Sequence, residues 1–87
     1  MAQYILLTHG NAKTAPPAAE WEQFLAAARQ SGLFAGGSEI GERVVLGDAQ
    51  AAKSSDHIVG YMRFDAEDKQ KLLELLKQHP VVVHGGA

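Results

Sequence analysis

The alternation of side chains over residues 58–64 predicts a strand that is covered on both faces. Ile58, Gly60, Met62 and Phe64 fall on one side of an extended ribbon, and Val59, Tyr61 and Arg63 on the other. Both sides are largely apolar, whereas a strand wet on one side alternates apolar with polar residues. Because helices of one chain supply only one cover, the second cover is expected to come from elsewhere.

A helix and an extended return segment are predicted after this strand. Asp65 is expected to cap the helix, with carboxylates in the first turn. An apolar stripe suited to a sheet is then formed by Leu72, Leu73, Leu75 and Leu76. Pro80 is expected to end the helix, and the valines of residues 81–83 to run extended toward a Gly85-Gly86 turn.

The first half of the chain predicts a strand followed by an amphipathic helix. Residues 4–8 read as a short buried strand that stops near His9. Trp21, Phe24, Leu25 and Ala28 follow at i, i+3, i+4 and i+7, the spacing of one helix face. Gly32 is expected to take a left-handed conformation after the helix, and Leu33 to fold back over its last turn.

Glycines separate this helix from a predicted third strand. Gly36-Gly37 and Gly41 loosen the backbone, and residues 42–46 then read as a strand. Residues 49–56 are small and polar without periodicity, which indicates a mobile connection.

The order strand, helix, apolar run and Gly-Gly occurs over residues 4–37 and again over residues 58–86. Two such βαβ halves predict one α+β domain over residues 1–87, with a ferredoxin-like βαββαβ plan. Its antiparallel sheet carries both helices on one face. The opposite face would expose Ile5 or Leu6, Val44 or Val45, and Val59 with Tyr61. Such an apolar patch exceeds what a monomer usually shows, so a homodimer with facing sheets, a dimeric α/β barrel, is expected.

Composition narrows the choice of partners and compartment. Eight Lys and Arg stand against ten Asp and Glu, and the basic residues are scattered, so neither nucleic acid nor an acidic membrane is an expected partner. The absence of cysteine suits a reducing cytoplasm. The apolar run at residues 4–7 is too short for a signal peptide or a membrane helix.

Three stretches of the sequence form a recognisable combination: YILLTHG, then W-x-x-F-L-x-x-A-x-x-S-G-L-F-A-G-G, and then IVGYMRFDA-x-D with LLELLKQHPVVVHGG. Together they resemble the YCII-related family of dimeric α/β-barrel proteins, in particular its small branch related to the DGPF proteins. The resemblance covers nearly the whole chain. It implies a ferredoxin-like protomer and a dimer formed face to face.

The chain departs from this family where members thought to be enzymes carry chemistry. Those members resemble one another in having a histidine on the first helix and an aspartate before the proline after the second helix. Here AAEWEQFLAAARQ has no histidine, and His79 precedes Pro80. The Asp-Gly-Pro-Phe segment is missing, with Gly47-Asp48-Ala49 in the nearest place. Relatives also continue past Gly-Gly with a further strand, whereas here either the last edge is shortened or residues 81–83 take its place.

Histidines are the residues best suited to proton transfer near neutral pH. His79 is the candidate catalytic residue; the alternative is a capping histidine, protonated at the carbonyl end of the second helix. His9, at the end of the first strand, is a candidate pocket residue, or simply exposed. His79 and His84 would point to opposite faces of an extended segment, so no metal site is expected.

Tyr61 and Arg63 share one face of the predicted strand at residues 58–64. They are candidates to hold a small anionic or oxygenated ligand, or else to lie in the dimer interface. The glycines at residues 36–41 follow a helix and precede a strand, the reverse of a phosphate loop, and no cofactor is expected.

These observations leave three functions open. The leading interpretation is a homodimer that binds a small molecule in a cleft between sheet and helices. The first alternative is a cofactor-free acid–base enzyme acting on small aromatic or lactone-like metabolites, with His79 moving the proton. The second is an accessory subunit whose cleft is closed by Trp21, Phe24 and Met62.

Overall fold

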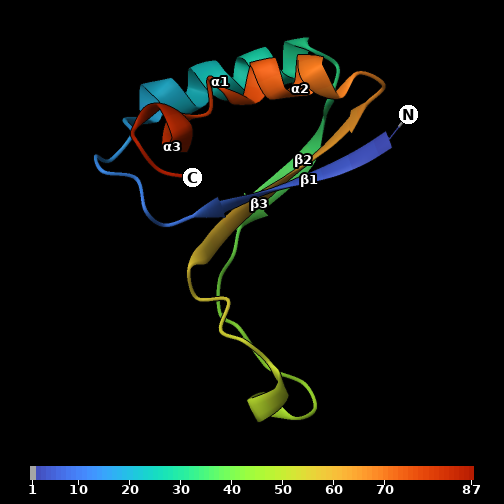
Figure 1. Cartoon of the computed structure of the whole chain (residues 1–87). Coiled ribbons are helices and arrows are strands. Elements are labelled where there is room, and N and C mark those ends of the chain that lie inside the picture. The colour runs from blue at the N-terminus through green and yellow to red at the C-terminus, as the bar shows by residue number, and fades with distance from the viewer. Residues whose placement is uncertain (1) are drawn as a thin grey trace.

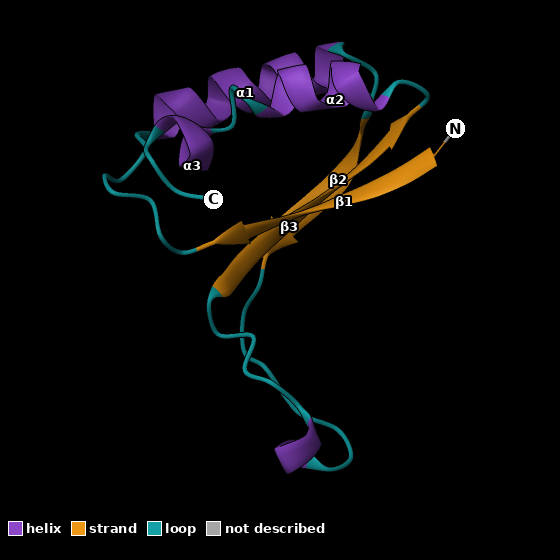
Figure 2. Ribbon diagram, viewed as in Figure 1, coloured by secondary structure: helices purple, strands orange, loops and turns teal. Residues whose placement is uncertain are grey.

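A computed structural model describes residues 2–87 as two layers, a sheet and helices on one of its faces (Figure 1). The strands are β1 (Ala2–His9), β2 (Phe34–Glu39) and β3 (Ile58–Ala66), all antiparallel to their neighbours in the order β1-β3-β2. The helices are α1 (Ala18–Gln30), α2 (Lys69–Leu76) and α3 (Pro80–Val83), with a 3-10 turn, η1 (Ala49–Ala51), between β2 and β3 (Figure 2). The predicted α+β class is confirmed, and the arrangement is compatible with a ferredoxin-like fold.

The core lies between the helices and the sheet. Alternation along β1 and β3 places Tyr4 opposite Phe64 and Leu6 opposite Met62 on the face toward the helices. The buried apolar cluster consists of Phe24, Ala28, Met62, Phe64, Ala66 and Leu72. It therefore draws on α1, α2 and β3, the three elements that the sequence predicts best.

The predicted first helix and its ending are confirmed. Phe24 and Ala28 are buried, and Trp21 and Leu25 are partly buried on the same face of α1. Gly32 has φ +75°, the left-handed conformation expected after a helix end. Leu33 packs against the core, as expected for a residue that folds back over the last turn.

The third strand lies earlier than predicted. Residues 42–46 are irregular and exposed, while β2 spans Phe34–Glu39 and includes both members of the Gly36-Gly37 pair. A Cβ on Gly37 would lie 2.4 Å from the backbone oxygen of Tyr61, so only glycine allows β2 to approach β3 this closely. The prediction followed the valines, but strand propensity has little effect without a neighbouring strand.

The cap of the second helix is Asp68 rather than Asp65. Asp65 lies within β3, which continues to Ala66. The Asp68 carboxylate accepts a hydrogen bond from the backbone N–H of Gln70 at 2.9 Å. Pairing with β1, where Gln3 lies opposite Asp65, extends the strand past the predicted start of the helix.

Residues 81–83 form a helix, not the predicted strand. His79 caps α3, and Pro80 occupies its first turn, where a missing N–H costs no hydrogen bond. Val81 is buried, and the N–H of Gly86 closes the turn by donating to the Val81 carbonyl at 2.8 Å. Capping and burial here outweigh the strand preference of valine.

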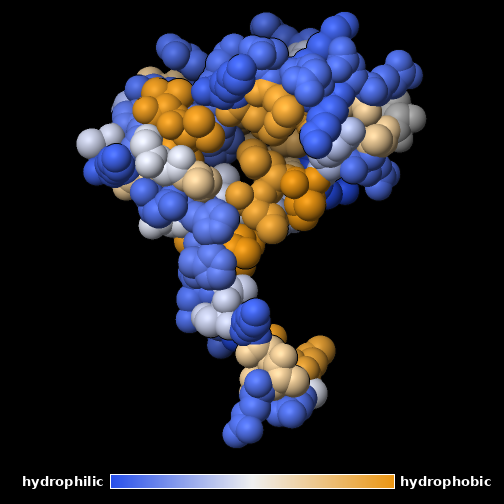
Figure 3. Space-filling view, viewed as in Figure 1, coloured by the Kyte–Doolittle hydropathy of each residue, from blue (hydrophilic) through white to orange (hydrophobic). Residues whose placement is uncertain are grey.

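The sheet face opposite the helices carries exposed apolar side chains. Ile5 is 63% exposed, and Leu7 and Val59 are also exposed on this face, which we call the bare face. The segment between β2 and β3 extends away from the two layers, and apolar atoms gather near its end (Figures 1 and 3). Its exposed apolar residues are Val44, Val45 and Leu46. In residues 2–87, no helix has the length and apolar character needed to cross a bilayer.

Candidate functional site

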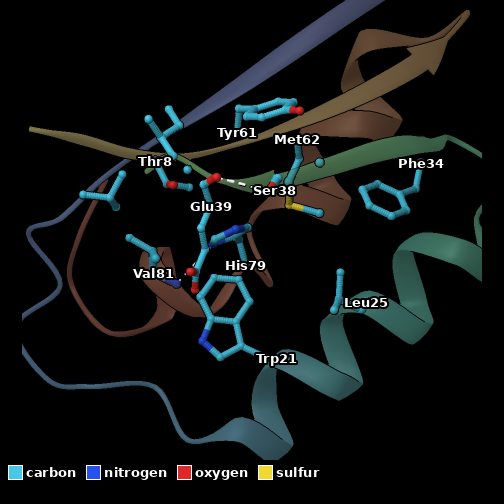
Figure 4. A pocket seen from close by; sticks show the side chains of 14 residues that line it. Thr8, Trp21, Leu25, Phe34, Ser38, Glu39, Tyr61, Met62, His79 and Val81 are labelled. Atoms are coloured by element: carbon cyan, nitrogen blue, oxygen red, sulfur yellow. Dashed lines mark hydrogen bonds between the residues drawn. The ribbon is translucent and has the colours of Figure 1, made fainter. Parts of the chain in front are cut away.

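A pocket of ≈ 580 Å³ opens between the helices and the sheet, beside the end of β2 (Figure 4). We call it the His79 pocket. It is lined by Thr8, Trp21, Leu25, Phe34, Gly37, Ser38, Glu39, Ile40, Val59, Gly60, Tyr61, Met62, His79 and Val81. Four elements, β1, α1, β2 and β3, therefore contribute to it together with α3 and the segment before it. The glycines keep side chains out of part of its wall.

His79 is a buried polar residue of this pocket, with 1% of its surface exposed. Its imidazole contacts the rings of Trp21 and Phe24 edge-on, with centroid distances of 5.0 and 4.9 Å. Nδ1 accepts a hydrogen bond from the backbone N–H of Val81 at 3.1 Å, which caps α3. His79 is therefore a capping residue, as one alternative predicted. It caps the N-terminus of α3, however, and not the C-terminus of the second helix.

The surroundings of His79 favour one neutral tautomer of its imidazole. Because Nδ1 is an acceptor, the neutral ring carries its proton on Nε2. Nε2 is buried and has no hydrogen-bond partner within residues 2–87. Burial lowers the pKa of His79 below its usual 6.5, since the charged form loses its hydration. The ring thus carries one unpartnered donor and no free lone pair.

Tyr61 and Arg63 share one sheet face, as predicted, but that face is not the one toward His79. In Figure 4 the Tyr61 ring and the Met62 side chain leave β3 on opposite sides, and His79 lies on the Met62 side. Tyr61 lines part of the pocket, whereas Arg63 does not. The Arg63 guanidinium donates to the Ala35 carbonyl at 3.0 Å, where the register of β2 shifts against β3.

Arg63 lines a smaller hollow of ≈ 300 Å³ on another part of the sheet. That hollow is also lined by Gln3, Tyr4, Ile5, Ala35, Phe64 and Asp65. The Asp65 carboxylate there opposes the binding of an anion, so the predicted pairing of Tyr61 with Arg63 on one ligand is not supported by the geometry.

His9 lies at the end of β1, as predicted, but outside the lining of the His79 pocket. Its ring stacks on that of His57, with centroids 5.1 Å apart and an interplanar angle of 29°. The His9 backbone N–H donates to the Ala87 carbonyl at 2.8 Å. His9 therefore joins the strand end to the last residues of the chain.

His84 forms a second polar cluster, which the sequence analysis missed. Its Nδ1 lies 2.6 Å from the Thr14 hydroxyl, and its Nε2 lies 2.5 Å from a carboxylate oxygen of Glu20. The cluster attaches the residues after α3 to the start of α1 and to the loop before it. None of these three residues lines the His79 pocket or the smaller hollow beside Arg63. Among residues 2–87, no group of three or more histidine or acidic residues is arranged to hold a metal ion.

Sequence reasoning missed Ser38 and Glu39 as pocket residues. It named Trp21 only as a residue that could close the cleft, because its helical spacing contains no signal that its ring borders an open cavity. Ser38 and Glu39 follow from the position of β2, which the sequence placed incorrectly. No family model, no curated protein and no solved structure gives a significant match to the chain.

Proposed function

We propose that this protein binds a small molecule in the His79 pocket. The observation that carries the proposal is the pocket itself, whose ≈ 580 Å³ fall within the ~300–1,000 Å³ typical of ligand sites. Its wall has the usual composition of such sites, mainly apolar and aromatic residues with a few polar groups.

The two alternatives account less well for the geometry. An accessory subunit with a closed cleft would have Trp21, Phe24 and Met62 fill the space, but Trp21 and Met62 border an open pocket. An acid–base enzyme needs a lone pair on His79 to take a proton, and its one lone pair already accepts from Val81. Ligand binding requires neither a closed cleft nor a free lone pair on His79.

Thermal denaturation with a library of metabolites tests the binding function. A ligand that prefers the folded state must raise the melting temperature. The variant Leu25→Trp places a bulky ring in the helix side of the pocket wall and is expected to abolish the shift. Leu73→Trp, at an exposed position of α2 outside the pocket lining, is the matched control and should retain it. If no compound raises the melting temperature, or if Leu25→Trp leaves every shift unchanged, the pocket is not a binding site.

The proposal includes a homodimer in which two bare faces meet as a dimeric α/β barrel. Ile5, Leu7 and Val59 are exposed on one side of the sheet, and α1, α2 and α3 lie on the other. A second copy presents an equally apolar surface and so removes both from water. Membership of the YCII-related family and a cytoplasmic location belong to the same proposal, supported by the order β1-β3-β2 and by the absence of cysteine.

A further inference from the structure

We propose that the His79 pocket selects an uncharged molecule whose oxygen accepts a hydrogen bond from His79 Nε2–H, and that it discriminates against carboxylates of the same shape. This inference rests on the proposed binding function and specifies the class of ligand. It differs from the sequence-based expectation of an anionic ligand held by Tyr61 and Arg63.

The first argument is the unpartnered donor. Nε2 of His79 is buried and finds no acceptor within residues 2–87. A buried donor without a partner costs about 1–3 kcal/mol, so a ligand that supplies an acceptor regains part of this energy on binding. The Nδ1 bond to Val81 fixes the tautomer, and His79 therefore cannot accept a hydrogen bond from the ligand.

The second argument is the charge of the lining. Among the residues that line the pocket, none is lysine or arginine, and Glu39 is the only acidic one. A carboxylate ligand would lose hydration, meet the Glu39 charge and gain no cationic partner. The neutral His79 does not compensate, because burial opposes its protonation.

The third argument is the apolar character of the remaining pocket wall. Trp21, Leu25, Phe34, Met62 and Val81 supply apolar surface around the donor. In Figure 4 the His79 ring lies between Trp21 on one side and Ser38 and Glu39 of β2 on the other, so the ring borders both the apolar wall and the polar end of β2. The ligand is therefore expected to join an apolar body to a carbonyl-type oxygen.

Three probes of similar shape test the inference: benzamide, benzoate and toluene. Titration of the isotope-labelled full chain, followed by NMR at pH 7.5 and low ionic strength, gives a dissociation constant for each. Benzamide is expected to bind at least about fivefold more tightly than toluene, because it supplies the acceptor. It is also expected to bind at least about tenfold more tightly than benzoate.

Variants distinguish the effect of losing the Nε2 donor from an effect on folding. His79→Asn retains a good capping residue for α3 but removes the Nε2 donor, so benzamide binding should weaken about three- to tenfold while toluene binding changes little. Glu39→Gln should strengthen benzoate binding about two- to fivefold at low salt and leave benzamide nearly unchanged. Glu22→Gln, an exposed residue of α1 outside the pocket lining, is the control for net charge.

The outcomes distinguish this inference from the binding function. Equal affinity for benzamide and benzoate, or a His79→Asn variant that binds benzamide as tightly as the wild type, overturns the inference. So does the absence of binding by all three probes. In each case the binding function stands if a library compound still gives a thermal shift that Leu25→Trp abolishes. Without any such compound, both proposals fail.

Discussion

At the scale of single residues, His79 has two roles that depend on one proton. Nδ1 caps α3, which places the proton on Nε2 and leaves that atom buried without a partner, in a residue that lines the pocket. Protonation of Nδ1 would break the cap and place a charge among the rings of Trp21 and Phe24. The stability of the protein is therefore expected to depend on the charge state of this ring.

We predict that His79 makes the protein less stable in mild acid. Its pKa is lowered in the folded state, so below about pH 6.5 the unfolded chain binds a proton that the folded chain does not. The free energy of unfolding should fall as the pH decreases from about 6.5 through the lowered pKa, and level off below it. Urea denaturation of the wild type and His79→Asn between pH 7.5 and 4.5 measures this.

The variant serves as the internal control, since it retains the other three histidines. His79→Asn should be less stable than the wild type at pH 7.5, because the smaller side chain leaves a cavity. The difference between the two proteins should shrink in acid. A difference that stays constant across the whole pH range would contradict this role of His79.

Sequence reasoning named His79 as the candidate catalytic residue but did not predict its tautomer. The position of His79 before Pro80 is evident from the sequence. Its tautomer depends on α3, however, and the three valines of that helix led to the prediction of a strand. Tyr61 and Arg63 were correctly placed on one sheet face by their period of two. Which face borders the pocket depends on where the helices pack, and residue spacing along the chain contains no such information.

At the scale of elements, glycine determines the position of the third strand. Sequence reasoning located β1, α1, β3 and α2 from apolar spacing, because these elements bury a regular stripe or face. It missed β2 because the Gly36-Gly37 pair lowers strand propensity, while the exposed Val44 and Val45 raise it elsewhere. Because Gly37 has no side chain, β2 can lie in close contact with β3 at this position.

We predict that Gly37→Ala destabilises the protein by about 1–3 kcal/mol. The added Cβ would lie 2.4 Å from the Tyr61 oxygen and 2.9 Å from the Met62 Cα, and neither backbone atom can yield without moving β3. Gly41→Ala is the control, since nothing lies within 4 Å of its Cβ position. Urea denaturation of both variants gives the comparison, and equal stabilities would show that β2 does not pair as described.

At the scale of the whole molecule, the described chain has one covered sheet face and one bare face. The helices bury the side that carries Met62 and Phe64, while Ile5 and Leu7 lie exposed on the other. The segment between β2 and β3 adds Leu46, which is 90% exposed. Exposed apolar surface at two separate places is costly for a lone protomer and accords with burial against a second copy.

The dimer is tested by charging the bare face. Wild-type protein at micromolar concentration should sediment at twice the 9.3 kDa protomer mass. The double variant Ile5→Lys, Leu7→Lys should sediment as the protomer, because each copy would place two more cations beside Arg63, the cross-strand neighbour of Ile5. Val82→Lys, Val83→Lys charges exposed residues of α3 and should leave the dimer intact. Circular dichroism must show that both variants stay folded. A wild-type protein of 9.3 kDa, or a folded double variant on the bare face that remains dimeric, would mean that the two sheets do not meet there.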